Sequence, residues 1–131
     1  MSQTLMTIRE MCDTFDVTPR TLRFYETKEL LAPIREGQKR LFTRRDRARL
    51  KLILRGKRFG FSLEEIRQLL DLYNPEEQHE TQLVKTLEMG GRHLAELERQ
   101  HAELEIAMNE LEDHLRWTSE RLAELNRHDA A

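Results

Sequence analysis

Apolar residues recur at helical spacing in four short stretches of the first half of the chain. Within each stretch an apolar side chain returns every three or four residues, which is typical of a helix with one buried face. We therefore predict four amphipathic helices between residues 6 and 73. The apolar positions are Ile8, Met11, Cys12 and Phe15; Leu22 and Tyr25; Leu50, Ile53 and Leu54; and Leu63, Ile66, Leu69 and Leu70.

Local sequence signals mark the start of each predicted helix. Thr7–Glu10 and Ser62–Glu65 fit the capping box, in which a hydroxyl accepts from a free amide and the glutamate bonds back to the cap. Thr43–Asp46 is a weaker version of the same motif. Thr18 precedes Pro19, which suits the first helical position because its missing N–H would have no partner there. The four helices are therefore predicted to begin just after these threonines and this serine.

The connections between the helices predict a winged helix-turn-helix. Only Phe15–Val17 separates the first two helices, which is typical of a helix-turn-helix. Pro33 then ends the helical pattern, Glu36–Gln38 predicts a turn, and Arg40–Phe42 is short and strand-like, so this segment predicts a small β-hairpin, or wing.

Two further breaks organise the rest of the chain. Gly60 is a natural stop for the third helix, and Asn74-Pro75 predicts a boundary. We predict a winged helix-turn-helix domain over residues 6–73 and a coiled-coil dimerisation helix with a short tail over residues 78–126. The expected fold class is all-α with a small β wing.

A heptad seam runs from Leu83 to Leu125. Its apolar positions alternate spacings of four and three residues, and with Leu87 at position a, His101 also falls at a. A stripe this narrow needs a partner helix. A second copy of the chain is favoured over an intramolecular hairpin, because no Pro or Gly turn interrupts the run after Gly90-Gly91. The predicted dimerisation residues are Leu83, Leu87, Leu94, Leu97, His101, Leu104, Met108, Leu111 and Leu115.

Charge is distributed unevenly along the 131 residues. Residues 1–73 hold 16 lysines and arginines against 10 acidic residues, whereas residues 74–131 hold 6 against 14. The basic half predicts a polyanionic partner. Apolar runs are too short to cross a bilayer, and the N-terminus lacks the apolar core of a signal peptide, so we expect a cytoplasmic, nucleoid-associated bacterial protein without a membrane partner.

The second predicted helix combines cations with two adjacent aromatic residues. Arg20 and Arg23 suit base edges or phosphates, and the Tyr25 hydroxyl suits a phosphate, while Leu22 and Phe24 are expected to anchor the helix. The alternative from composition alone is a solvated basic face packed by the aromatics. Cations follow in and after the wing at Lys39, Arg40, Arg44, Arg45, Arg47 and Arg49.

We expect phosphate contacts from Lys39, Arg40, Arg44 and Arg45. Such contacts supply affinity without sequence information. Arg47 and Arg49 are instead expected on a solvated helix face.

The segments Thr7–Pro33, Lys39–Phe42 and Arg58–Leu70 together resemble the DNA-binding domain of MerR-family transcriptional regulators. The sequences "TLRFYE", "KRLF" and "RFGFSLEEI" stand in the family's order. The resemblance implies homodimers joined by an antiparallel coiled coil. Such dimers bind promoter DNA and distort the spacer between promoter elements so that RNA polymerase can use them.

The resemblance also implies roles for single residues. Arg23 and Tyr25 match the family's helix contacts, and Arg40 matches its wing arginine, while the groove-facing start of the helix holds Thr18, Arg20 and Thr21. Phe42 replaces the usual tyrosine, which removes a hydroxyl from the expected wing contacts, and the wing turn has one glycine where two are common.

Sensing functions are less clear from the sequence. Metal-sensing members carry cysteines beyond the long helix, but the single cysteine here is Cys12, expected to be buried and inert, with a redox switch as the alternative. Trp117 is expected to pack on the partner's DNA-binding domain or to line a small effector pocket, and His101 to fix the coiled-coil register. His114 and Glu110 predict a surface pair rather than a metal site. No catalytic residue, cofactor or metal site is expected.

Short-tailed relatives imply control of fatty or branched-chain acyl-CoA breakdown, with an effector of unknown chemistry. Two rival functions remain open from the sequence. One is a coiled-coil adaptor that touches nucleic acid only nonspecifically, and the other is an architectural DNA-bending protein without an inducer.

Overall fold

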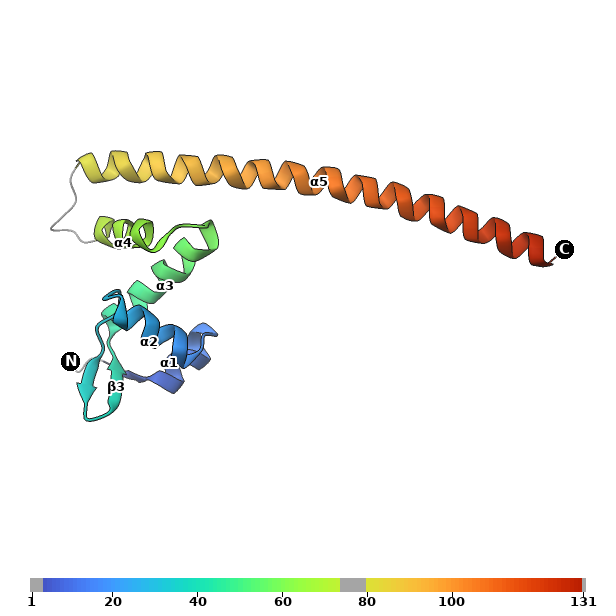
Figure 1. Ribbon diagram of the computed structural model, residues 1–131. Helices are drawn as coiled ribbons and strands as arrows, with labels where there is room; N and C mark the ends of the chain where they lie inside the picture. The colour runs from blue at the N-terminus through green and yellow to red at the C-terminus, as the bar shows by residue number, and fades with distance from the viewer. Residues whose placement is uncertain (1–3, 74–79, 131) are drawn as a thin grey trace. The chain divides into compact units, whose positions relative to one another are not determined.

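The computed structural model describes residues 4–73 and 80–130, in two compact units, Met1–Gly90 and Gly91–Ala131. The predicted Asn74-Pro75 boundary lies outside the described residues. The first unit holds four short helices and a small sheet (Figure 1). These helices are α1 (Ile8–Phe15), α2 (Pro19–Thr27), α3 (Arg44–Phe59) and α4 (Leu63–Leu72).

The predicted helix starts are confirmed. Thr7, Thr43 and Ser62 each accept a hydrogen bond from the backbone amide three residues on, and the acidic side chain there returns one to the cap amide. Thr18 caps α2 through Thr21 N, with Pro19 at the first helical position. These bonds satisfy amides that have no partner within the helix, which fixes where each helix begins.

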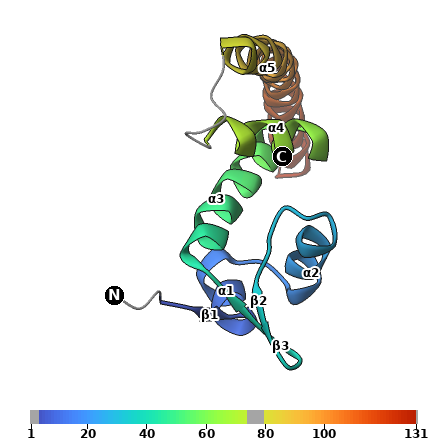
Figure 2. The same cartoon turned by 90° about the vertical axis from the view of Figure 1, so that its left-hand side faces the viewer.

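The wing is part of a three-stranded antiparallel sheet of order β1-β3-β2 (Figure 2). Strand β2 (Ile34–Glu36) pairs with β3 (Lys39–Phe42) as the predicted hairpin, and Gly37 in the turn has a φ of 65°. The sequence did not predict β1 (Met6–Thr7), which pairs with β3 at Met6–Phe42 and Thr7–Leu41. Two residues are too short to leave a period-two pattern, so only the tertiary pairing reveals this strand.

The hydrophobic core joins all four helices to β3. Leu22, Leu50 and Ile53 are fully buried, and Ile66 and Leu70 of α4 close the cluster. Phe42 is also fully buried. Its ring therefore belongs to the core.

Helices α3 and α4 approach each other closely at Gly56. A Cβ at this position would stand 2.9 Å from Ile66 Cγ1, so glycine is required for the observed packing. Gly60 then ends α3 in the left-handed region with a φ of 88°, as the sequence predicted. The short α3–α4 connection thus follows from one glycine that permits contact and another that permits the turn.

Asp46 is the buried carboxylate of the first unit, with a relative exposure of 3%. Its Oδ1 accepts from Ala32 N at 3.0 Å, and its Oδ2 accepts from Thr43 N and Thr43 Oγ1, both at 3.0 Å. One side chain thereby caps α3 and fixes the loop that leaves α2. The weak capping motif in the sequence gave no indication of the bond to Ala32.

We expect Asp46→Ala to lower the free energy of unfolding by about 2–3 kcal/mol, because it leaves buried donors without an acceptor. Asp13→Ala is the matched control, since Asp13 is exposed on α1, and its effect should stay within about 0.5 kcal/mol. Urea denaturation followed by circular dichroism measures both. Equal stabilities for the two variants would contradict this role of Asp46.

Helix α5 (Glu80–Ala130) contains the predicted heptad seam. Leu83, Leu87 and Leu94 are exposed, as are the later seam leucines, of which Leu104 exposes 59% of its surface. Surface ion pairs such as Arg99 with Glu96 and Glu103 lie off the seam. Within the described ranges, no helix has the length and apolar character needed to cross a membrane.

Candidate nucleic-acid interface

Helix α2 presents its cations to solvent and its apolar side chains to the core. Arg20 and Arg23 are exposed, whereas Leu22 is fully buried. The Thr18 and Thr21 hydroxyls lie 2.9 Å apart at the start of the helix, and Thr18 Oγ1 accepts from Thr21 N. The two guanidinium groups are therefore exposed on one surface of α2. The packing of Leu22 in the core fixes which surface of the helix this is.

Of the two aromatic residues of α2, Tyr25 and not Phe24 is the buried one. The Tyr25 ring is buried, with 3% exposure, while Phe24 is 44% exposed. The prediction that Phe24 anchors the helix is therefore wrong, since Tyr25 does so together with Leu22. Burial raises the pKa of the Tyr25 phenol, so its hydroxyl stays protonated at neutral pH. Its phosphate contact stays a prediction.

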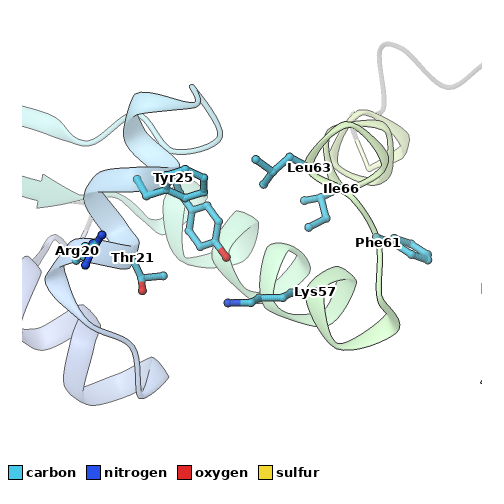
Figure 3. Close-up of a pocket in the computed structure, with 8 residues that line it drawn as sticks. Arg20, Thr21, Tyr25, Lys57, Phe61, Leu63 and Ile66 are labelled. Atoms are coloured by element: carbon cyan, nitrogen blue, oxygen red, sulfur yellow. The ribbon is translucent and has the colours of Figure 1, made fainter.

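A groove of about 420 Å³ lies between α2 and the α3–α4 connection (Figure 3). Arg20, Thr21 and Tyr25 line its α2 side, and the Tyr25 hydroxyl points toward Lys57 of α3. Apolar side chains from Phe61, Leu63 and Ile66 form the opposite wall. The sequence analysis missed Lys57, because nothing local in the sequence shows that the end of α3 returns beside α2.

The predicted wing cations divide into different environments. Lys39 is exposed beside the hairpin turn. Arg40 is more enclosed, and its Nε donates to Glu26 Oε2 of α2 at 2.6 Å. Exposed Arg45 lines a groove next to Glu29. The phosphate contacts expected of these residues stay predictions, and Arg40 has a carboxylate partner within the protein.

Arg44 belongs to a second basic surface on α3. It lines a groove of about 470 Å³ together with Arg47, Lys51, Arg55 and Tyr73. Lys51 and Lys57 are six residues apart, which puts them roughly 120° apart around the helix axis. Arg44 and Lys51 therefore lie on a different side of α3 from the groove shared by Arg20 and Lys57.

Arg47 and Arg49 do not form a solvated helix face, and that prediction is wrong. Arg47 Nη1 donates to Thr4 O at 2.7 Å, and Arg49 Nε donates to Leu30 O at 2.7 Å. Burial is the largest cause that lowers the pKa of Arg49. Both arginines bind backbone carbonyls and stabilise chain segments that the sequence places far from them.

Cys12 and His114, the other side chains considered for sensing, have different environments. Cys12 is partly buried and packs against the core, and desolvation raises the pKa of its thiol, which disfavours the reactive thiolate. In the second unit His114 stacks on Trp117 with ring centroids 6.0 Å apart. Among the residues that the structure describes, no group of three His, Cys, Asp or Glu side chains is placed to hold a metal ion.

Comparison with known proteins places these features in a family. The profile described as "MerR HTH family regulatory protein" matches residues 6–73, and the one described as "MerR, DNA binding" matches residues 47–116. The chain belongs to the MerR family of transcriptional regulators. It is accordingly a DNA-binding transcriptional regulator with a winged helix-turn-helix and a long C-terminal helix, as the sequence indicated.

Individual MerR-family proteins show how far the similarity extends. The regulator ZntR of Escherichia coli K12 is 37% identical over 107 residues, which cover 80% of this chain and 74% of ZntR. A MerR-family regulator from Bacillus cereus is 31% identical, with a TM-score of 0.62 over 82% of this chain and 79% of that one. The regulator HiNmlR, solved on promoter DNA, has the same fold, with a TM-score of 0.64 at 23% identity, over 81% and 80% of the two chains.

Lysines 57 and 85 offer a matched comparison, since both are exposed and Lys57, unlike Lys85, lines the groove with Arg20. We expect Lys57→Ala to weaken DNA binding similarly for all sequences and to reduce the slope of log affinity against log salt by about one. Lys85→Ala should leave that slope unchanged. Fluorescence anisotropy with labelled duplexes at several salt concentrations measures both, and equal slopes for the two variants would show that Lys57 does not bind phosphate.

Proposed function

We propose that the protein binds a pseudo-palindromic promoter site as a homodimer and regulates transcription by distorting the spacer between the promoter elements. The observation that carries this proposal is the orientation of α2, whose buried Leu22 and Tyr25 leave Arg20 and Arg23 outside. A recognition helix needs this division, because its cations can meet base edges and phosphates only if its opposite face is held rigidly.

The proposed DNA contacts come from more than one element. Thr18, Arg20, Thr21 and Arg23 at and after the start of α2 would enter the major groove, and the Tyr25 hydroxyl and Lys57 would hold the adjacent backbone. Lys39 at the wing and Arg44 and Arg45 at the start of α3 would bind phosphate outside the groove. Contacts with the phosphate backbone supply affinity and position, and contacts with base edges in the major groove supply specificity.

The seam of α5 supports self-association. Its leucines are exposed along the helix from Leu83 to Leu125. Leaving so many leucines in water is costly, since burial of each large apolar side chain stabilises by about 1.5–3 kcal/mol. The proposed interface consists of Leu83, Leu87, Leu94, Leu97, His101, Leu104, Met108, Leu111 and Leu115.

The dimer would act on DNA through its geometry. A coiled coil fixes the separation of two recognition helices, and DNA that does not match this separation must bend or untwist to bind both. RNA polymerase would then bind promoter elements that the distortion has realigned. Solved relatives support the DNA partner, because HiNmlR, which shares the fold, was solved on promoter DNA.

The target genes stay a prediction. Genes of fatty or branched-chain acyl-CoA breakdown are the expected class, and the genes adjacent to the operator would test it. DNase footprinting on genomic fragments separates this proposal from a coiled-coil adaptor, which would give uniform, salt-sensitive protection. Transcription in vitro with and without cell metabolites tests whether an effector acts, as an architectural protein would not respond.

We expect Arg23→Ala to weaken binding to the operator by about 1–3 kcal/mol and to reduce the preference for it over other DNA. Arg116→Ala is the control, because Arg116 is an exposed arginine of α5 that lies off the seam. Competition binding with operator and random duplexes measures the effect. Unchanged preference after Arg23→Ala would remove this residue from the reading surface.

We expect Leu104→Lys to produce monomers, because it puts a cation at the middle of the apolar seam. Ala102→Lys adds the same charge two residues away, off the seam, and should leave the dimer intact. Sedimentation equilibrium gives the two masses. A dimer that survives Leu104→Lys would mean that the helices associate through another face.

A further inference from the structure

Glu26 connects the recognition helix to both strands of the wing hairpin. Its Oε1 accepts from Arg35 Nε of β2 at 3.1 Å, and its Oε2 accepts from Arg40 Nε of β3 at 2.6 Å. Figure 2 shows these strands beside α2. A single carboxylate thus uses both oxygen atoms to tie two strands to this helix.

The ion pairs of Glu26 are partly shielded from water. The side chains of Glu26 and Arg40 are 19% and 21% exposed, whereas that of Arg35 is 51% exposed. Exposed ion pairs contribute little because water and salt screen them. The pair with Arg40 is shorter and more enclosed, so we expect it to hold the wing more firmly than the pair with Arg35.

The position of Glu26 on α2 places its carboxylate next to a residue proposed to contact DNA. Glu26 follows Arg23 by three residues, so the two side chains are neighbours on the helix surface. An unpaired carboxylate beside a phosphate-binding arginine would repel the DNA backbone. Arg35 and Arg40 neutralise it, and the guanidinium groups are in turn held on the protein.

We propose that Glu26 is a positioning residue for DNA recognition, which clamps the wing to α2 and keeps Arg35 and Arg40 off the phosphates. This proposal rests on the proposed function, since it concerns how the same surface distinguishes its operator. Lys39 precedes Arg40 in β3, directly after the hairpin turn. The clamp therefore fixes where Lys39 stands relative to the arginines of α2.

Two effects follow from removal of the carboxylate, and both reduce specificity. A wing that is free to move no longer presents Lys39 at one distance from α2, which weakens operator binding. Two released guanidinium groups bind any phosphate, which strengthens nonspecific binding. The ratio of operator to nonspecific affinity must then fall, whichever effect is larger.

The test compares Glu26→Gln with Glu36→Gln in the full-length chain. Both substitutions remove one negative charge near the wing, but Glu36 lies opposite Lys39 in the hairpin and is exposed. We expect Glu26→Gln to lower the ratio of operator to nonspecific affinity by roughly tenfold. For nonspecific DNA, the slope of log affinity against log salt should become steeper by about one to two. Glu36→Gln should leave the ratio unchanged. Equal ratios for both variants would overturn the positioning role.

Arg40 variants test the clamp from its other side. If Arg40 remains paired with Glu26 in the DNA complex, Arg40→Gln lowers specificity without reducing the slope of log affinity against log salt. A slope smaller by about one would instead show that Arg40 binds phosphate, and the proposal would fail. Arg40→Lys keeps the charge but loses the planar guanidinium, so it should also lower specificity, and it replaces Glu26→Gln if that variant does not fold.

A measurement without DNA separates the clamp from the proposed function. A double-mutant cycle of Glu26→Gln and Arg40→Gln in thermal unfolding should give nonadditive shifts of the midpoint, and additive shifts would overturn the clamp. If the wild-type chain prefers no site, the proposed function fails and the positioning role fails with it. If it prefers one and Glu26→Gln retains that preference, only the positioning role fails.

Discussion

Burial of the α2 residues Leu22 and Tyr25 is the constraint on which the proposed DNA-binding surface depends. Both side chains pack in the same core as Leu50 and Ile53 of α3, so the helix has one possible rotation about its axis. Each such burial stabilises by about 1.5–3 kcal/mol, far more than any exposed cation contributes. The orientation of Arg20 and Arg23 is therefore a consequence of apolar packing rather than of their own interactions.

Polar side chains then fix the segments around this core. Asp46 holds the loop after α2, Arg49 binds Leu30 O, and Arg67 Nη2 donates to Lys28 O at 2.7 Å. All three act on the end of α2 or on the chain that follows it. Several charged residues of this basic domain thus keep α2 in place, so fewer cations have exposed, unpaired charges than the composition suggests.

The four short helices and the long helix α5 differ in a way that bears on the two proposed binding roles. The four short helices and β3 enclose a shared apolar core, whereas the seam leucines of α5 are exposed in a single copy. A helix of this kind gains stability only from a partner. The residues proposed for recognition and those proposed for assembly therefore come from different elements of the chain.

Sequence alone determined the helix starts, the wing hairpin, the stop at Gly60 and the seam, because each depends on residues within a few positions of one another. Tertiary structure decided which charges are available. Phe24 and Tyr25 are adjacent and similar in size, so only packing against α3 could show that Tyr25 is inside. Only the tertiary structure likewise shows that Lys57 lines a groove with Arg20 and that Arg40 donates to Glu26. Side chains distant in sequence meet only after the core has formed.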